Sequence, residues 1–393
     1  MTTQYSLRIL WLGGIFPEKE MLETAAVSPA ANRWQSGLLT ALSGNGCAVR
    51  ILGHQPEPAW PRGRLRMRKK ERMAPLHGVA HIPQTLVGYW NLPRLREWLL
   101  VRQHVCAFRG ILASGFRPDC VLCYNVYDHS VAIAREAKRL GIPWVPVVAD
   151  ASGDPAAYGR LERQLRQAAG CVFLSWSSFL RWNGTPKLHL DGGVTVAPER
   201  ELDTPPANAP KVILYTGVLN QYGGIDLLLD AFALIRDPDA RLWICGKGEN
   251  RKLRQMLQGD SRIIFFGCVP EEKLRALSRQ AWVMVNPRPT HVPGNENNFP
   301  SKVLEYLAYG KPVVSTMTPG IAPEYAPLLR VPTEETQLPL AQCLCGVLEW
   351  SREQRAEHAT TVCHFLASQK TWNQQASRLN EFVRGITPRN DPA

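Results

Sequence analysis

Long apolar runs, a secretion signal and metal-ligand spacings are all missing from this sequence of 393 residues. No run reaches the roughly 18 consecutive apolar residues that a membrane-spanning helix needs. The first residues, MTTQYSLRILWLGG, lack the basic start, long apolar stretch and small-residue cleavage site of a signal peptide. The sequence therefore predicts a cytoplasmic protein, and any association with the inner face of the membrane would be peripheral.

The ten cysteines have no arrangement that is typical of a metal site. Cys120 and Cys123 form a CxxC, but this spacing places both in one apolar strand, and no second pair of ligands has zinc-like spacing. Cys47, Cys171 and Cys245 also lie in apolar, strand-like runs, where a free thiol behaves as a small hydrophobic group. We therefore expect structural thiols and no bound metal.

Acidic residues are scarce in the first half of the chain. Residues 1–200 contain 25 Lys and Arg against 14 Asp and Glu, whereas residues 201–393 contain 21 against 20, so the first half holds nearly all of the net charge of +12. The segment 62–72 is the most basic, through Arg62, Arg64, Arg66, Arg68, Lys69, Lys70 and Arg72.

Aromatic residues flank this basic segment: Trp60 precedes it, and Tyr89, Trp90 and Trp98 follow it. Basic residues beside Trp and Tyr suit a surface that contacts anionic lipid headgroups. A solvated loop is the alternative interpretation, and nucleic-acid binding is disfavoured because no nucleic-acid motif accompanies the segment. We favour an anionic membrane surface.

The length of the chain predicts two domains, because one compact core rarely grows this large. Short apolar runs alternate with helical segments in both halves, which is typical of a parallel, doubly wound sheet. The proline-rich stretch 201–210 interrupts this alternation and predicts a linker. The expected fold is therefore α/β, with a Rossmann-like domain at 1–200, a second at 211–368, and a C-terminal helix at 369–393 that crosses back to the first domain.

Glycines follow two apolar strands of the second half. KVILYTG leads into a turn with Gly217, Gly223 and Gly224, and ARLWICG is followed by Lys247 after Gly246. Such turns let a phosphate group approach backbone N–H groups at the start of a helix. Glycines often serve the bend alone, so these turns indicate a phosphate site only together with other residues.

The segment NENNFPSKVLEYLAYGKPVVST predicts the chemistry more specifically. Pro300 and Ser301 are residues that begin helices, and Lys302 follows in the first turn, where its ammonium and the exposed N–H groups suit a diphosphate. Glu305 lies one turn beyond Ser301, on the same helix face, and its carboxylate suits a ribose diol. The alternatives are a solvated lysine and a surface carboxylate.

These stretches resemble the donor-binding domain of glycosyltransferase family four, whose enzymes have the GT-B fold. YTGVLNQYGGIDLLLDAF, WICGKGE, IIFFGCVPEEKL and ENNFPSKVLEYLAYGKPVVS carry the resemblance, over about residues 211–316, and the branch with FPSK in this loop is the most similar. The resemblance implies two Rossmann-like domains facing a cleft, transfer from a nucleotide-diphosphate sugar with retention of configuration, and no metal or other cofactor.

The sequence departs from the family pattern in two loops. The family has two glutamates with seven residues between them; Glu305 matches the second, whereas Asn297 stands at the first. The family also places an arginine and a lysine in the loop after the first strand of this domain, where this chain has Val218 and Gly223. The resemblance therefore implies that Lys302 supplies more of the positive charge at the diphosphate than in other members, with help from backbone amides and from Arg288 or Lys247.

The first half resembles the family only in layout, and three of its loops supply candidate residues. Gly13 and Gly14 follow its first strand, where the family's loop approaches the donor phosphate and the acceptor. His129 opens the helix after DCVLCY and is expected to contact the donor sugar, although plain helix capping is an equal alternative. Asp150 follows IPWVPVVAD and is a candidate on the acceptor side.

The predicted enzyme is a hexosyltransferase that uses a UDP- or GDP-linked sugar and a lipid-linked or surface-polysaccharide acceptor. The alternatives are another GT-B enzyme, such as a nucleotide-sugar epimerase, and a non-catalytic relative that binds saccharide or a partner. The predicted catalytic residues are Lys302, Asn297, His129 and Asp150. The predicted donor-binding residues are Gly217, Gly223, Gly224, Gly246, Lys247, Asn298, Phe299, Pro300, Ser301 and Glu305, and Gly13 and Gly14 form the predicted acceptor-side loop.

Overall fold

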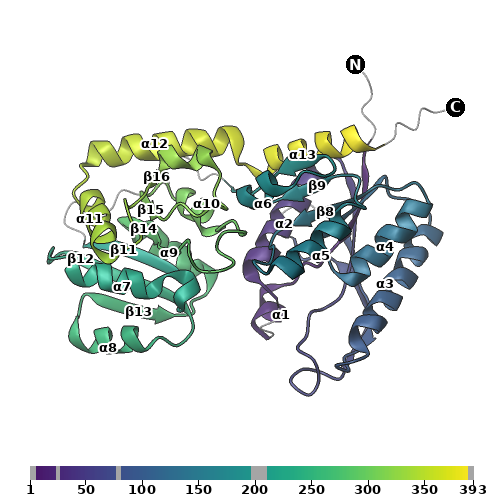
Figure 1. Ribbon diagram of the computed structural model, residues 1–393, viewed down its shortest axis with the longest axis horizontal. Coiled ribbons are helices and arrows are strands. Elements are labelled where there is room, and N and C mark those ends of the chain that lie inside the picture. Colours follow the sequence, from purple (N-terminus) through teal and green to yellow (C-terminus); the bar gives the residue numbers. More distant parts are fainter. Residues whose placement is uncertain (1–5, 24–26, 77–80, 196–209, 388–393) are drawn as a thin grey trace. The chain divides into compact units, whose positions relative to one another are not determined.

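The computed structural model describes residues 6–23, 27–76, 81–195 and 210–387, and it divides into two compact units (Figure 1). Unit 1 comprises Met1–Gly193 and Trp372–Ala393, and unit 2 comprises Val194–Thr371. The sequence analysis sets the corresponding domain limits at 200, 211 and 369. The predicted linker 201–210 lies outside the described residues except for Pro210.

Unit 1 is built on an eight-stranded sheet with the order β10-β9-β8-β7-β1-β2-β5-β4. All neighbouring strands run parallel except β4, which pairs antiparallel with β5 at one edge. The strands are β1 (Arg8–Leu12), β2 (Ala48–Gly53), β4 (Lys70–Met73), β5 (Pro83–Leu86), β7 (Cys120–Tyr124), β8 (Trp144–Val148), β9 (Cys171–Phe173) and β10 (Lys187–His189). The strands β1, β7 and β8 consist almost entirely of buried side chains, as a sheet covered on both faces requires.

The basic segment of unit 1 contains short strands. β4 begins within it, and β3 (Arg66–Met67) pairs antiparallel with β6 (Tyr89–Trp90) as a separate two-stranded ribbon. Arg and Lys alternate with other residues here, so the apolar periodicity that marks a strand is absent from the sequence.

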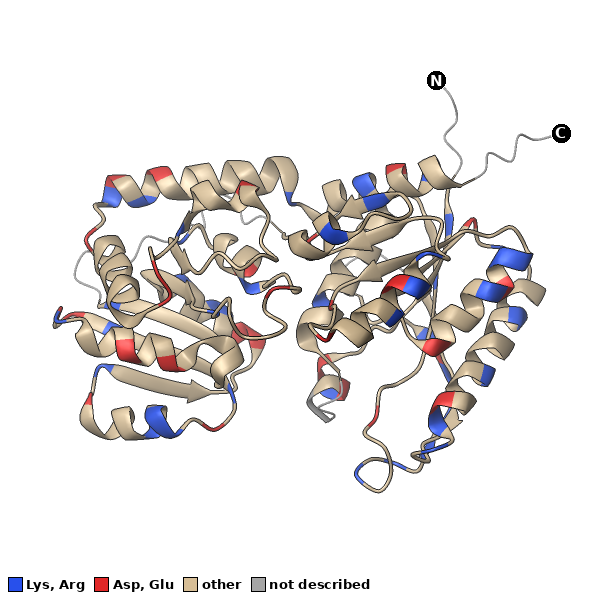
Figure 2. Cartoon of the chain, viewed as in Figure 1, with Lys and Arg blue, Asp and Glu red and all other residues tan. Residues whose placement is uncertain are grey.

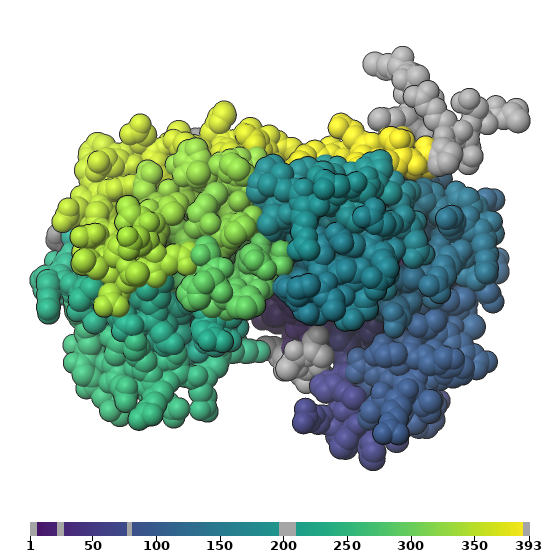
Figure 3. All heavy atoms as spheres, viewed as in Figure 1, coloured from purple at the N-terminus to yellow at the C-terminus, as the bar shows by residue number. Residues whose placement is uncertain are grey.

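The helices of unit 1 include one from the far end of the chain. They are α1 (Glu18–Glu23), α2 (Pro29–Gly44), α3 (Arg96–Ala113), α4 (Asp128–Arg139), α5 (Pro155–Leu165), α6 (Trp176–Arg181) and α13 (Trp372–Ile386). The C-terminal helix α13 packs against α2, and Figure 3 shows its yellow atoms against the teal atoms of this unit. A side chain at Gly37 of α2 would overlap the Trp372 ring, so the glycine permits this close packing.

Unit 2 has a six-stranded, fully parallel sheet with the order β13-β12-β11-β14-β15-β16. Its strands are β11 (Lys211–Val218), β12 (Ala240–Lys247), β13 (Ile263–Gly267), β14 (Val283–Asn286), β15 (Val313–Ser315) and β16 (Leu329–Arg330). Its helices are the 3₁₀ helices η2 (Gln221–Gly223) and η3 (Pro323–Leu328), and α7 (Ile225–Leu234), α8 (Arg251–Gly259), α9 (Glu271–Gln280), α10 (Lys302–Leu307), α11 (Gln337–Leu348) and α12 (Arg352–Gln369).

Both sheets reverse their strand order at one point. The reversal lies between β1 and β7 in unit 1 and between β11 and β14 in unit 2. In doubly wound sheets, ligands bind beyond the carboxyl ends of the strands at this switch point. The predicted α/β class with two Rossmann-like sheets is confirmed, and the two switch points are where a functional site is expected.

The structure bears on two expectations drawn from the composition, one about the CxxC cysteines and one about membrane-spanning helices. Cys120 and Cys123 both lie in the buried strand β7, three residues apart and therefore on opposite faces of the sheet, and burial raises the pKa of both thiols, as expected of structural cysteines. Within the described residues, no helix combines the length and the apolar character needed to cross a membrane.

Candidate functional site

At the switch point of unit 2, the start of α10 is tied to the carboxyl end of β11. The Lys302 ammonium donates a hydrogen bond to the carbonyl of Thr216, and a Cβ added to Gly217 would lie 2.7 Å from that nitrogen. One turn along α10, the Tyr306 hydroxyl accepts a hydrogen bond from the Thr216 amide at 3.0 Å. Burial raises the pKa of Tyr306, so its hydroxyl stays protonated. A primary ammonium is thus held at the position where a ligand phosphate is expected.

The turn after β11 leaves no room for side chains at its glycines. The Tyr215 hydroxyl donates to the carbonyl of Val218 at 2.7 Å, and a side chain at Gly223 would overlap both groups. Gly224 has a φ of 74°, a left-handed conformation that favours glycine, and a side chain there would overlap the carbonyl of Pro287. The backbone of this turn, without side chains at its glycines, therefore lies next to the carboxyl end of β11.

The end of β12 adds a second close approach. A side chain at Gly246 would overlap the carbonyl oxygen of Gly217, its neighbour in the parallel register. Lys247 is exposed at the end of the same strand, opposite Val218 in register, and its carbonyl accepts a hydrogen bond from Leu219 at 3.0 Å. The predicted donor-side glycines therefore lie together at the carboxyl ends of β11 and β12, with Lys247 beside them.

Tyr222 organises the loop that leads into α10. The side-chain amide of Asn295 is buried and donates to the carbonyls of Tyr222 at 3.1 Å and of Pro289 at 2.8 Å. The Asn298 amide donates to the Tyr222 hydroxyl at 2.8 Å, and the Arg288 guanidinium lies 4.6 Å from the centre of the same ring. These contacts hold the loop against η2 and add a second cation near the site.

Asn297 and Glu305 occupy the two positions where the family resemblance implies carboxylates. The Asn297 side chain is 6% exposed, and its amide donates to the Glu296 carboxylate at 3.3 Å. Glu305 is half-buried on α10, one turn after Ser301, whose side chain makes no capping hydrogen bond. Position 297 therefore carries no charge, and the adjacent carboxylate, Glu296, is exposed.

Two residues between these positions are packed into unit 2. Phe299 and Pro300 are buried, and the Phe299 ring lies 5.7 Å from the ring of Tyr325 in η3. They directly precede Ser301 and Lys302, and their role in donor binding stays a prediction.

Unit 1 contains a pocket of about 430 Å³ at its own switch point. The walls include the residues that directly follow β1, β2, β7 and β8, and the starts of α2, α3 and α4. The pocket thereby brings together the four residues that the sequence analysis selects in this half of the chain. Those lining residues are Gly13, Gly14, His129 and Asp150, joined by Gly53, His54, Arg96, Glu97, Tyr124 and Asn125.

Asn125 holds one wall of this pocket in an unusual conformation. Its φ is 60°, and its side-chain oxygen accepts hydrogen bonds from the amides of Ala149 at 2.8 Å and Asp150 at 3.2 Å. Left-handed backbone at a residue other than glycine is uncommon and concentrates at functional sites. Asn125 therefore fixes the backbone at Asp150, whose side chain is exposed.

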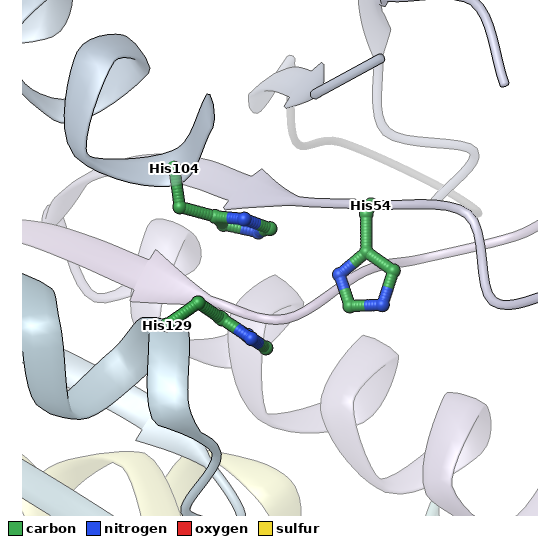
Figure 4. A group of neighbouring side chains, drawn as sticks. All are labelled: His54, His104 and His129. Carbon is green, nitrogen blue, oxygen red and sulfur yellow. The ribbon is translucent and has the colours of Figure 1, made fainter. Parts of the chain in front are cut away.

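Three histidines meet beside the pocket, and sequence reasoning selects only one of them. His54 and His129 line the pocket, whereas His104 lies fully buried against them. His54 follows β2, His104 lies on α3, and His129 is the second residue of α4. Figure 4 shows the rings of His104 and His129 one above the other, with an edge of the His54 ring beside them. The ring centres lie 4.2 Å apart for His104 and His129, 5.3 Å for His54 and His104, and 5.2 Å for His54 and His129.

Burial keeps this cluster of His54, His104 and His129 uncharged. It lowers the pKa of His54 to about 3 and of His104 to about 4, and it holds the pKa of His129 well below the ordinary value. At neutral pH, His129 therefore meets a ligand in the pocket as a neutral hydrogen-bonding group. His54 could have been found from the sequence, because it follows the glycine that ends a predicted strand; His104 gives no such signal.

The basic segment of unit 1 splits into a structural and an exposed part. Arg72 and Lys70 contact the Glu20 carboxylate at 2.6 and 3.5 Å, and Arg64 contacts Glu57 at 2.9 Å. The exposed members are Arg62, Arg64, Arg66, Arg68 and Lys69. Figure 2 shows blue segments along the loop before α3 and along α3 itself.

Three tryptophans lie exposed beside these cations. Trp60, Trp90 and Trp98 have exposed fractions of 46%, 47% and 59%, and the Arg66 guanidinium lies 5.3 Å from the Trp90 ring. Tyr89, which the sequence analysis adds to this surface, is instead buried, and its hydroxyl donates to the carbonyl of Gln55. That expectation was wrong because successive residues of β6 point to opposite sides.

Comparisons with known proteins agree with this architecture. Residues 210–348 match the family model described as glycosyl transferases group 1, and no curated protein matches the chain. A glycosyltransferase from Rickettsia africae has a TM-score of 0.71 at 13% identity, over 99% of this chain and 100% of that one. Sucrose-phosphate synthase from Thermosynechococcus elongatus gives 0.69 at 16%, over 97% and 99%. HepE from Anabaena, in complex with UDP and glucose, gives 0.64 at 14%, over 96% and 100%.

At these identities the solved structures show the fold, which is GT-B. The family model covers the part of unit 2 that contains the β11 turn, the Tyr222 loop and α10. Together the fold and the family model support a transferase of glycosyl type.

Proposed function

We propose that this GT-B protein is a retaining glycosyltransferase of family four, in the branch with an FPSK loop, and that it transfers a hexose from a nucleoside diphosphate to a saccharide. The observation that carries the proposal is the position of Lys302. Its ammonium lies at the carboxyl end of β11, at the switch point of unit 2, within the segment that matches group 1 glycosyl transferases.

The donor site follows from the residues around that ammonium. Lys302 and the backbone amides of the turn from Gly217 to Gly224 would hold the diphosphate, and Glu305 would accept hydrogen bonds from the ribose hydroxyls. The structural relative HepE is in complex with UDP in one structure and with UDP-glucose in another. UDP is therefore the first nucleotide to test, with GDP as the second.

Transfer would depend mainly on stabilising the leaving diphosphate. Preorganised charges and dipoles at a developing negative charge are usually the largest catalytic contribution. No carboxylate stands at position 297, so an attack by the acceptor on the same face as the departing phosphate accounts for retention without a covalent intermediate. The Asn297 amide would hydrogen-bond a hydroxyl of the donor sugar. An inverted anomer in the isolated product would overturn this part of the proposal.

Unit 1 would contribute the sugar-facing groups of its pocket. His129 would hydrogen-bond the donor sugar as a neutral imidazole, and Asp150 and the loop of Gly13 and Gly14 would face the acceptor hydroxyl. The pocket supports these roles, because its walls contain all four residues.

The acceptor would be a lipid-linked saccharide or a growing surface polysaccharide at the inner face of the membrane. Exposed tryptophans among arginines suit the interface of an anionic bilayer, where the ring is half-immersed and the cation contacts phosphate. Trp60 precedes Arg62 in the chain, Trp90 lies 5.3 Å from the Arg66 guanidinium, and Trp98 lies 5.6 Å from that of Arg102. These three exposed tryptophans support this acceptor class.

Thermal unfolding with a panel of nucleotides tests the donor site. A ligand that binds only the folded protein raises its melting temperature with the logarithm of its concentration. We expect one of UDP or GDP, and its sugar conjugates, to stabilise the protein, and Lys302→Ala to abolish the shift. Lys138→Ala, on an exposed lysine of α4, is the matched control. No shift with any nucleotide would favour a non-catalytic relative, and conversion of the sugar nucleotide without acceptor would favour an epimerase.

Vesicle sedimentation tests the membrane proposal. We expect more binding to anionic than to neutral vesicles, and loss of most binding when Trp60, Trp90 and Trp98 are all replaced by serine. Leu180 and Leu338 are also exposed apolar residues, so their replacement by serine is the matched control. Equal binding to both kinds of vesicle would contradict the proposal.

A further inference from the structure

We propose that His54, His104 and His129 form a binding site for a divalent transition-metal ion, with Zn²⁺ as the best match. Each side chain offers one ligand nitrogen, and these three atoms all lie within 4.8 Å of one another. The sequence analysis predicts no metal site, because the three residues come from separate elements and no spacing motif connects them.

His104 supplies the observation that points to a ligand. Its Nδ1 lies 2.8 Å from the carbonyl of Leu100, which fixes the proton on Nδ1 and leaves the lone pair on Nε2. That Nε2 is fully buried and has no hydrogen-bond partner among the residues that the structure describes. A buried polar atom without a partner costs stability, and a metal ion would satisfy it. A histidine held by a backbone carbonyl through its other nitrogen is the usual arrangement around protein-bound zinc.

The three rings differ in orientation around the space that their ligand nitrogens share. The His54 ring stands nearly perpendicular to those of His104 and His129, at 87° and 89°, whereas the latter two are stacked. Zinc–nitrogen bonds of about 2.0–2.1 Å require nitrogens about 3.3 Å apart in a tetrahedral site. His104 is held by Leu100, so His54 and His129, which face the pocket, would rotate to close the site.

The donor set selects the metal. Three imidazole nitrogens suit Zn²⁺, Cu²⁺, Ni²⁺ or Co²⁺, and disfavour Mg²⁺ and Ca²⁺, which prefer oxygen. The fourth position would open into the pocket, where water or an oxygen of a bound molecule can coordinate. Arg96 is the nearest cation on the wall, and its charge is offset by Glu97, whose carboxylate lies 3.1 Å from its Nε.

A consequence of this site rests on the proposed function. His129 would hydrogen-bond the donor sugar in the transferase and coordinate the metal in the metal-bound state. Because one imidazole nitrogen cannot do both, Zn²⁺ would weaken binding of the sugar nucleotide, and the sugar nucleotide would weaken Zn²⁺ binding by the same factor. Zn²⁺ would therefore inhibit transfer.

Titration of the full, tag-free, metal-stripped chain with Co²⁺ tests the site directly. We expect one equivalent to produce the strong visible absorption of four-coordinate cobalt, to be displaced by Zn²⁺ and to persist in excess Mg²⁺. His104→Phe and His54→Gln should each weaken Co²⁺ binding at least tenfold. His358→Phe, which replaces a buried histidine of unit 2, should leave it unchanged. If His104→Phe does not fold, as judged by circular dichroism, His54→Gln decides.

The proposal is overturned if no such absorption develops, or if both cluster variants bind Co²⁺ as the parent protein does. Inhibition is tested separately, by comparing the rate of transfer with and without Zn²⁺ for each protein. We expect Zn²⁺ to lower the rate in the parent and in His358→Phe, but not in His54→Gln. Absence of any transferase activity would refute the proposed function and leave the cobalt result intact.

Discussion

The two units share a topology and differ in the chemistry that it positions. Each has a glycine at the end of its second strand, Gly53 in unit 1 and Gly246 in unit 2, where a side chain would overlap the backbone carbonyl of a glycine at the end of the first strand. Those partner glycines are Gly13 and Gly217. The same steric requirement therefore recurs at both switch points, although the surrounding sequences have little in common.

The side chains singled out at these two switch points differ in charge. Unit 2 presents the ammonium of Lys302 and the carboxylate of Glu305, which suit a charged diphosphate and a ribose. Unit 1 presents imidazoles whose pKa values are lowered by burial, which suit neutral hydroxyl groups or a metal ion. The topology sets where a ligand can bind, and the side chains decide its charge.

Removing the cation of unit 2 should have the largest effect. Lys302→Met keeps most of the apolar stem and removes the charge. We expect the kcat of transfer to fall about 100- to 1000-fold, because a preorganised charge at the leaving group is lost. Steady-state kinetics with the donor identified by thermal unfolding measure this, with Lys138→Met as control. A fall of less than threefold would show that the backbone turn alone stabilises the diphosphate.

Substitution of the paired glycines tests whether the two switch points are equivalent. Gly53→Ala and Gly246→Ala should each destabilise the protein by about 1–3 kcal/mol, because the new methyl group overlaps a carbonyl. Hydrogen exchange should locate the loss of protection in β1 and β2 for the first and in β11 and β12 for the second. Gly346→Ala is the control, since a side chain there meets nothing within 4 Å. Equal loss of protection in both units for either variant would contradict the expectation that each substitution destabilises its own unit.

The fold and the donor side could be predicted because their signals are local. The strands of unit 2 are apolar runs, and the predicted site residues from Asn297 to Glu305 are nearly consecutive, so helix periodicity alone places Glu305 one turn after Ser301. The interactions of Lys302 and Tyr306 with Thr216 could not be predicted, because they join residues 86 and 90 positions apart.

The unit 1 pocket shows the limit of local signals more clearly. Its walls come from four strand ends and three helix starts, and His54, His104 and His129 come together only in the folded chain. No local pattern of the sequence connects these segments.

Neutralising Glu305 should have a smaller effect than removing Lys302. Glu305→Gln keeps the shape of the side chain and one acceptor oxygen, so we expect UDP or GDP to bind about tenfold more weakly, the loss of roughly one charge-assisted hydrogen bond. Isothermal titration with the diphosphate and with the corresponding deoxyribose diphosphate measures the loss. If Glu305 contacts the ribose, the variant should discriminate less between the two; unchanged discrimination would assign the ribose to another residue.

The smallest effect concerns a buried imidazole of unit 2, His358, which packs against Trp350 and lies far from α10 in the sequence. Burial lowers its pKa to about 4, so above pH 6.5 it is neutral in both the folded and unfolded states. As the pH falls below 6.5, the unfolded chain takes up a proton that the folded chain excludes, and the free energy of unfolding decreases. At pH 5.5 this amounts to about 1 kcal/mol. We therefore expect His358→Phe to reduce, by about that amount, the stability lost between pH 7.5 and 5.5 in urea denaturation. The comparison is between two pH values, so any constant change in packing cancels. An unchanged difference would contradict the contribution assigned to His358.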